Sequence, residues 1–246
     1  MFVAQTNSTN TLLKEMIAAG NPPEFIYTGF QTAGRGQTGN GWESEEGKNL
    51  LCSVLISHQP SAFSIQPFYL NVAVSVAVHR VISELGISEL GIKWPNDIYW
   101  KDKKLAGILI ENAIVGNELK CSIAGIGLNV NQTEWHSDAP NPVSLKQITG
   151  KDYDIDTLMP LLHHEVNKAL KEDVWNYYKS HLYRREGFWP FVEREVSVEP
   201  TTNASSQACE PFLARIKDIL PSGEILLEDE KGQPKKYHFK QIRYVV

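Results

Sequence analysis

The first third of the chain alternates apolar stretches with polar ones at two different periods. Apolar residues recur at helical spacing after Ser8 and stop before Gly20, which predicts a helix that begins at a capping residue. Compact apolar runs that are too short for helices predict strands. In chain order the pattern predicts a helix over 8–19, a strand over 24–30, a loop over 31–48, a strand over 49–57 and a long buried helix over 66–85.

From residue 91 the apolar runs become short and closely spaced, which predicts a meander of neighbouring strands. These strands are expected at 92–94, 97–100, 105–111 and 119–130. Residues 132–150 are polar, contain two prolines and predict a loop, whereas residues 155–182 carry apolar positions at helical spacing and predict a helix.

After residue 190 the pattern changes again, to short strands separated by turn residues. The strands are expected at 195–198, 212–220, 224–227, 237–239 and 242–246. This spacing is typical of a small all-β barrel. We therefore expect two domains, over residues 1–189 and 190–246.

Composition narrows the class of protein. The chain has 246 residues, 42% of them hydrophobic and 22% charged, which is typical of a globular protein. Its net charge of −5 argues against nucleic acid as a general partner. The three cysteines are far apart, no signal peptide is visible, and the longest apolar stretch, 72–78, is too short to cross a membrane. The cytoplasm is the expected location.

A glycine-rich segment is the first candidate for chemistry. Residues 34–42 read Gly-Arg-Gly-Gln-Thr-Gly-Asn-Gly-Trp. Glycines let backbone N–H groups approach a phosphate or carboxylate, Arg35 adds a charged fork, and Trp42 offers a flat face to a purine. No Gly-Lys-Ser/Thr follows, so this is not a P-loop, and no helix opens as in a dinucleotide fingerprint. A flexible surface hairpin is the alternative.

Two further segments carry charged and polar residues beside strands. Residues 93–97 read Lys-Trp-Pro-Asn-Asp, and a bend at the proline would aim Lys93, Asn96 and Asp97 toward one spot. Lys104 begins a strand of small residues that a ligand can approach. A strand end with a packed tryptophan and a solvated turn lysine are the alternatives, and for each segment alone they are favoured.

The third segment, residues 125–131, reads Gly-Ile-Gly-Leu-Asn-Val-Asn. Glycine weakens a strand and often marks close approach of a ligand, although a β-bulge is the alternative. Asn129 and Asn131 alternate on one face. The Ser-Thr-Asn start of the first helix is a plain cap or, because helix starts favour anions and polar rings, a second binding element.

In this order the segments resemble the biotin–protein ligases (biotin–[acetyl-CoA-carboxylase] ligases), and the resemblance covers essentially the whole chain. It implies an α+β fold: a mixed β-sheet with helices packed on it, similar to class II synthetases, followed by a small SH3-like β-barrel. It also implies a two-step reaction, in which biotin and ATP give biotinyl-5′-AMP and the biotinyl group then passes to a lysine of a biotin carboxyl carrier domain. Mg²⁺ would accompany ATP, with no nucleic-acid or membrane partner.

The resemblance also implies roles for individual residues. Two anions meet in the first step, so Arg35 and Lys104 are expected at the carboxylate and α-phosphate, with Lys93 as a secondary electrostatic contributor. The expected biotin-binding residues are Ser8, Thr9, Asn10, Gln31, Gly34, Arg35, Lys104, Gly107 and Gly127. The expected ATP- or adenylate-binding residues are Arg35, Gln37, Trp42, Lys104, Asn129 and Ser144. Asn96 and Asp97 are expected contacts for Mg²⁺.

Two rival functions stay open at this point. A lipoate or octanoate ligase or transferase shares the broad fold, but those families usually show an Arg-Arg-x-Ser-Gly-Gly-Gly stretch that is absent here. A non-catalytic binding module is the alternative from another class. Because the Ser-Thr-Asn segment begins at residue 8, no room is expected for the N-terminal DNA-binding domain of some relatives. Whether two chains pair as a homodimer through the central sheet is left open.

Many members of the family carry basic residues where this chain has Gln37 and Asn40. Fewer positive charges are expected to hold an adenylate less tightly. Gln37→Arg should therefore slow release of the intermediate, measured as loss of labelled adenylate from the protein during gel filtration. An unchanged release rate would contradict the prediction.

Overall fold

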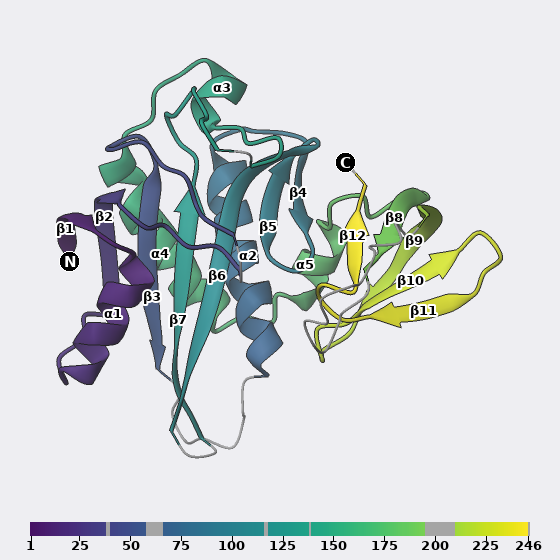
Figure 1. The fold of residues 1–246 in the computed structure, drawn as a ribbon, viewed down its shortest axis with the longest axis horizontal. Coiled ribbons are helices and arrows are strands. Elements are labelled where there is room, and N and C mark those ends of the chain that lie inside the picture. The colour runs from purple at the N-terminus through teal and green to yellow at the C-terminus, as the bar shows by residue number, and fades with distance from the viewer. Residues whose placement is uncertain (38–39, 58–65, 116–117, 138, 195–209, 246) are drawn as a thin grey trace, which may run out of the picture.

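The protein folds into a large and a small β-sheet, with helices packed against the large one (Figure 1). The structure is a computed structural model and describes residues 1–37, 40–57, 66–115, 118–137, 139–194 and 210–245, with side chains over the same ranges except 113–120. The α+β class expected from the sequence is confirmed.

Seven strands form the large sheet in the order β1-β2-β3-β7-β6-β5-β4. Only β1 and β2 pair in parallel, and every other neighbour is antiparallel. The strands predicted up to residue 130 are all present, and β1, which the pattern did not predict, is added at one edge. The bounds are β1 (Phe2–Thr6), β2 (Phe25–Gln31), β3 (Leu50–Ser57), β4 (Leu90–Lys93), β5 (Asp97–Trp100), β6 (Lys103–Val115) and β7 (Glu118–Leu128).

Helices cover both faces of this sheet. α2 (Pro67–Glu84) and α4 (Ile155–Ala169) pack on one face, where the inward residues of β3, β6 and β7 join them in the main core. α1 (Thr9–Ala18) lies on the opposite face against β2, β3 and β7. Its stripe buries Leu13 with Ile26 and Ile123 in a second, smaller core.

Two predictions for the helical part were wrong. The helix expected over 155–182 is two helices, α4 and α5 (Trp175–Ser180), because a polar segment interrupts it and the Asp173 carboxylate accepts the Trp175 amide at 3.2 Å. The loop expected over 132–150 contains α3 (Leu145–Thr149). A capping box of Ser144 and Gln147 begins this helix and Gly150, at φ 74°, ends it.

Five antiparallel strands form the small sheet in the order β11-β10-β9-β8-β12. Residues 195–198, expected as its first strand, lie outside the described residues, and β8 takes that place. Glu193 of β8 accepts hydrogen bonds from Tyr237 and Lys235 of β11, both at 2.6 Å, so the sheet curls to bring these two strands together. The bounds are β8 (Trp189–Glu193), β9 (Phe212–Ile219), β10 (Ile225–Asp229), β11 (Pro234–Tyr237) and β12 (Ile242–Tyr244).

The small sheet packs against the β4–β5 end of the large one, so that one hydrophobic core runs through both (Figure 1). The Trp94 indole donates to the Gly223 carbonyl at 3.1 Å and lies edge-on to Phe239. Arg184 donates to the Val245 carbonyl at 2.6 Å. The Lys-Trp-Pro-Asn-Asp segment therefore lies between the two sheets. Among the described residues, none of the helices has both the length and the apolar character needed to span a membrane.

Tyr178 of α5 connects the helices to the segment between β4 and β5. It is fully buried, and its hydroxyl donates to the Pro95 carbonyl at 2.8 Å. Tyr178→Phe leaves this carbonyl without its partner and is expected to lower the free energy of unfolding by about 2 kcal/mol. Urea unfolding measures the change.

Tyr237→Phe is the matched control, because its hydroxyl bonds the half-exposed Glu193 carboxylate, which water can solvate instead. A smaller loss is expected for this variant. Equal losses for the two variants would contradict the role assigned to Tyr178.

Candidate functional site

The site is built on a row of glycines in the large sheet. Gly107 of β6 pairs with Gly127 of β7, and Gly125 pairs with Leu109 and Ser53 on its two sides. A Cβ atom built on Gly127 would lie 2.5 Å from Trp42 Cε2, and one on Gly125 would lie 2.9 Å from Asn10 Cγ. We call these three glycines the glycine floor; the chain's own side chains approach it closely.

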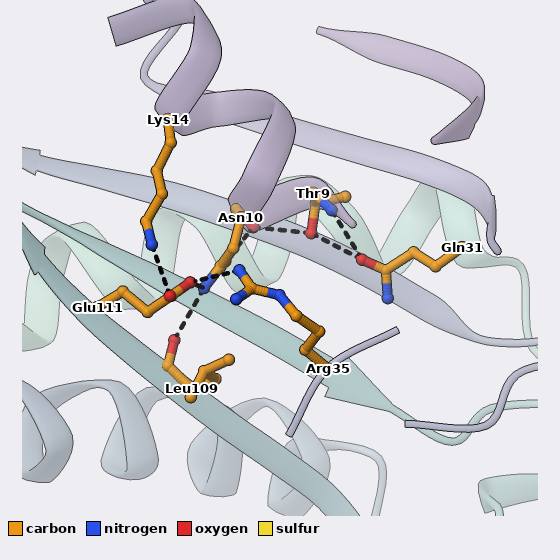
Figure 2. A network of polar contacts seen from close by, with 8 residues as sticks. Thr9, Asn10, Lys14, Gln31, Arg35, Leu109 and Glu111 are labelled. Atoms are coloured by element: carbon orange, nitrogen blue, oxygen red, sulfur yellow. Dashed lines mark hydrogen bonds and ion pairs between the residues drawn. The ribbon is translucent and has the colours of Figure 1, made fainter. Parts of the chain in front are cut away.

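Polar side chains of α1 and its neighbouring strands form a continuous chain of hydrogen bonds above the floor (Figure 2). Gln31 Oε1 accepts the Thr9 amide at 2.8 Å, and Thr9 Oγ1 lies 2.7 Å from Ser53 Oγ. Ser53 in turn donates to Asn10 Oδ1 at 2.6 Å. Ser8 occupies the N-cap position as predicted, but its side chain makes no capping hydrogen bond. The first turn of α1 is therefore tied to the sheet through side chains.

Glu111 is the charged end of this chain (Figure 2). Its Oε2 accepts from Asn10 at 2.8 Å and from Arg35 at 2.9 Å, and its Oε1 accepts from Lys14 at 2.6 Å. Burial alone would raise the pKa of the Glu111 carboxyl, but the hydrogen bonds from Lys14 and Asn10 and the nearby positive charges lower it below the usual value. Glu111 is therefore an ionised counter-charge for Arg35.

Lys104 and Trp42 lie at the other end of the floor. Lys104 Nζ forms an ion pair with Asp97 Oδ2 at 2.8 Å and lies 5.7 Å from the centre of the Trp42 ring. That ring rests on Gly107 and Gly127. Its buried Nε1 has no hydrogen-bond partner in the part of the chain that the structure describes. A ligand acceptor at this point would satisfy it.

Lys93 lies on the same face but is enclosed by aromatic rings. Its Nζ donates to the Tyr99 hydroxyl at 2.9 Å and lies 5.3 Å from the Tyr244 ring of β12. Burial lowers the pKa of Lys93 to about 8, against a partly compensating attraction from Asp97.

The expected magnesium contacts differ in what they offer. Asn96 is buried, donates to Asn71 Oδ1 and the Ile108 carbonyl at 2.9 and 3.0 Å, and accepts from Gln37 at 3.2 Å. Its amide is thus used within the chain. Asp97 provides a carboxylate that is not buried, beside Lys104. Within the described residues no cluster of three His, Cys, Asp or Glu side chains could hold a metal by itself. The donor set therefore fits Mg²⁺ only as one carboxylate that supplements phosphate oxygens.

Asn129 and Ser144 hold the segment after β7. Asn129 Nδ2 donates to the Val143 carbonyl at 3.0 Å, while its buried Oδ1 has no partner among the described residues. Ser144 accepts from the Gln147 amide and so begins α3. Asn129 thus keeps one oxygen available, whereas the Ser144 side chain is used as a helix cap.

Sequence-predicted residues form two groups on the α1 face of the sheet, whereas Asn96 donates to Asn71 of α2, which packs on the opposite face. Thr9, Asn10, Gln31 and Arg35 gather around α1, whereas Lys104, Trp42 and Asp97 gather near Gly107. Arg35 and Lys104 do not share a partner: each pairs with its own carboxylate. Of the three residues expected to point toward one spot, Lys93 and Asp97 lie opposite each other in the β4–β5 pairing. The Asn96 side chain instead donates to Asn71 of α2 and to the Ile108 carbonyl.

Two functional candidates were missed from the sequence. Ser53 is a polar residue inside the otherwise apolar run 50–56, and Glu111 follows Gly107 and Leu109 at alternate positions on one face. Both signals were visible in the sequence, but neither could be interpreted without knowing which strands are neighbours.

A mixed sheet with a glycine floor, a polar helix start and separate cations defines a ligand-binding α+β domain. A model of the biotin/lipoate A/B protein ligase family matches residues 2–129, and the chain belongs to this family.

Curated relatives extend the likeness beyond the matched segment. The bifunctional ligase/repressor BirA of Bacillus spizizenii is 34% identical over 231 residues, covering 90% of this chain and 67% of that protein. BirA of Escherichia coli K12 is 29% identical over 192 residues, covering 76% of this chain and 55% of that protein. The chain thus spans about half the length of several curated relatives that it matches.

Solved structures confirm the fold. Biotin protein ligase from Aquifex aeolicus in complex with biotin and ATP superposes with a TM-score of 0.76 at 23% identity, covering 100% of this chain and 98% of that one. The Leishmania major biotin protein ligase with biotinyl-5-AMP gives 0.61 at 20% identity, covering 96% and 97%. Both sheets of this chain lie within these superpositions.

Lys93 gives a pH-dependent prediction. Its folded-state pKa of about 8 lies below the unfolded value of 10.5, so the buried charge destabilises the fold below pH 8 and this penalty disappears as pH rises toward 10.5. Lys93→Met should therefore be more stable than the wild type at pH 7, by a margin that shrinks at pH 10. Urea unfolding at both pH values measures it.

Lys103→Met, at an exposed position of β6, is the control and should show no such pH dependence. A Lys93→Met variant that is less stable at pH 7, or equally displaced at both pH values, would contradict the prediction.

Proposed function

We propose that this chain is a biotin–protein ligase, which joins biotin to AMP and then to a lysine of a biotin carboxyl carrier domain. The observation that carries the proposal is the arrangement on the glycine floor: the neutral Thr9 and Gln31 side chains at one end, and Lys104 with Trp42 at the other (Figure 2). Biotin has the same division into a neutral polar ring and a carboxylate. Relatives of this chain from Mycobacterium tuberculosis and Paracoccus denitrificans are named as biotin–[acetyl-CoA-carboxylase] ligases, and the Aquifex aeolicus structure is of a biotin protein ligase. These names support the choice.

The ring of biotin would bind at the α1 end. Thr9 and Gln31 present a hydroxyl and an amide from the start of α1 and the end of β2. Gly34 lies close to Gln31, since a Cβ built on it would be 3.3 Å from Gln31 Nε2. The backbone of this loop can therefore approach the biotin ring. The valeryl chain would then run along the floor toward Gly107.

The reaction would take place near Lys104. The biotin carboxylate attacks the α-phosphorus of ATP, the P–O bond to the β-phosphate breaks, and pyrophosphate leaves. Two anions approach each other in this step, and a fixed cation offsets their repulsion and the charge that develops in the transition state. Lys104 can take this role by exchanging Asp97 for the substrate anions. Mg²⁺ would supply further charge neutralisation on the phosphates, with Asp97 as its protein contact.

Arg35, Trp42 and Asn129 would act beside these groups. Within the described residues the Arg35 guanidinium makes one side-chain hydrogen bond, to Glu111, and its side chain is 43% exposed, so further N–H donors can face a ligand. The Trp42 side chain would lie between the biotin ring and the nucleotide. The Asn129 oxygen that has no partner among the described residues would accept a hydrogen bond from the adenine amino group. No protein nucleophile is needed, since the mixed anhydride reacts directly with the acceptor lysine.

The wider setting follows from this chemistry. The acceptor is a carrier domain of a biotin-dependent carboxylase, and the compartment is the cytoplasm, where ATP and newly made acceptors meet. We also retain the division into a catalytic domain over residues 1–189 and a β domain over 190–246.

Lys104→Ala tests the proposal at its centre. With ATP, Mg²⁺, biotin and a carrier domain, the wild type should add one biotinyl group to one lysine, read as a mass gain, and should exchange pyrophosphate into ATP only when biotin is present. Lys104→Ala should slow this exchange on the order of a hundredfold.

Lys101→Ala is the control, because Lys101 lies in the adjacent turn, where its amine pairs with the exposed Glu89 and lies over the Trp100 ring. Its rate should match the wild type. Exchange that depends on lipoate or octanoate rather than biotin would favour the rival ligase, and no acid-dependent exchange would leave a binding module.

A further inference from the structure

The hydrogen-bond chain beneath the proposed ring site has a direction, and one residue sets it. Building on the proposed function, we propose that Glu111 is a positioning residue that makes the pocket select a cyclic urea, by fixing which groups donate and which accept.

The first step is the orientation of the Asn10 amide. Asn10 Nδ2 lies 2.8 Å from Glu111 Oε2 and 3.3 Å from the Leu109 carbonyl oxygen. A carboxylate and a carbonyl can only accept, so the amide nitrogen must face β6. Asn10 Oδ1 is thereby turned toward Ser53.

The second step is the single proton of Ser53, a fully buried residue. Ser53 Oγ lies 2.6 Å from Asn10 Oδ1 and 2.7 Å from Thr9 Oγ1. An amide oxygen cannot donate, so Ser53 must give its proton to Asn10. The short contact between Ser53 and Thr9 then needs the proton of Thr9.

The third step concerns the groups that face the ligand. Gln31 Oε1 accepts the Thr9 amide at 2.8 Å, which leaves Gln31 with N–H donors. The one hydroxyl proton of Thr9 is used within the chain, by Ser53 or by Gln31 Oε1 at 3.2 Å. Thr9 therefore offers a lone pair and Gln31 a donor. A cyclic urea, with N–H donors beside a carbonyl acceptor, complements this pair.

The negative charge of Glu111 allows only one donor–acceptor direction along the hydrogen-bond chain from Asn10 to Thr9. A neutral amide at position 111 could donate as well as accept, and Asn10 could then turn over at the cost of its longer, 3.3 Å bond to the Leu109 carbonyl. Its nitrogen would donate to Ser53, the Ser53 proton would pass to Thr9, and the Thr9 hydroxyl would point its proton at the ligand. A urea N–H would then meet an O–H, whereas the ordered pocket offers it a lone pair.

Glu111→Gln tests this in the full chain, with biotin and its cyclic carbamate analogue as probes. In the second compound a ring oxygen, which can only accept, replaces the N–H that faces Thr9. Calorimetric titration without ATP gives both dissociation constants. The wild type should prefer biotin, and Glu111→Gln should reduce the ratio of the two constants about tenfold. Lys14 donates to Glu111 Oε1, whereas Asn10 donates to Oε2, so Lys14→Met should leave the ratio unchanged.

Glu111→Gln also removes the ion pair between residue 111 and Arg35. A second variant therefore separates the effect of the hydrogen-bond chain from the effect of this ion pair. Ser53→Ala cuts it between Asn10 and Thr9, and should lower the ratio by itself. Adding Glu111→Gln to Ser53→Ala should then change the ratio no further. Thermal unfolding of each variant reports its folding, and Ser53→Ala carries the test if Glu111→Gln does not fold.

The outcomes separate the two proposals. Equal loss of affinity for both probes in Glu111→Gln, or an effect on the ratio that persists in the Ser53→Ala background, would overturn the positioning role while leaving the ligase function intact. A wild-type chain that does not bind biotin would overturn the ligase function, and the positioning role with it.

Discussion

Close approach of side chains to the backbone of β6 and β7 is the constraint from which the site follows. Gly107, Gly125 and Gly127 carry no Cβ, so the first turn of α1 and the Trp42 ring lie directly on the strands. Larger residues would lift α1 away from the sheet, and Asn10 would no longer reach both Ser53 and Glu111. The glycines weaken the strands locally, but the antiparallel pairing of β7 on both sides offsets this loss.

Charge is arranged on this face in matched pairs. Arg35 faces Glu111 at 2.9 Å and Lys104 faces Asp97 at 2.8 Å, and each partner is partly exposed. Such pairs stabilise the fold little in water, because solvation of the separate ions is nearly as favourable. An incoming carboxylate or phosphate can therefore replace a resident carboxylate at small cost. The site can hold cations ready for anionic substrates in a chain whose net charge is −5.

Much of the fold could be predicted because periodicity reports burial directly. The strand over 49–57 and the helix over 66–85 appear as β3 and α2 within one or two residues. β1 was missed because its burial is irregular and its pairing with β2 is parallel and distant in sequence. For the candidate site, the glycine segments and the Ser-Thr-Asn start lie close together in the structure, as the resemblance implied. Ser53 and Glu111 could not be assigned, since their roles depend on the register that places them on either side of Asn10.

Lys93 shows how register also limits what a motif can reveal. The Lys-Trp-Pro-Asn-Asp segment was expected to gather its polar groups at one point. β4 and β5 pair with Lys93 opposite Asp97, and the Lys93 amine donates to the Tyr99 hydroxyl. Tyr183 and Tyr244 complete the enclosure from the chain after α5 and from β12. A cation held by rings of both sheets is attracted by their electron-rich faces and loses hydration on three sides. Lys93 can therefore influence a ligand near Lys104 only through its field, while its direct contacts join the small sheet to the large one.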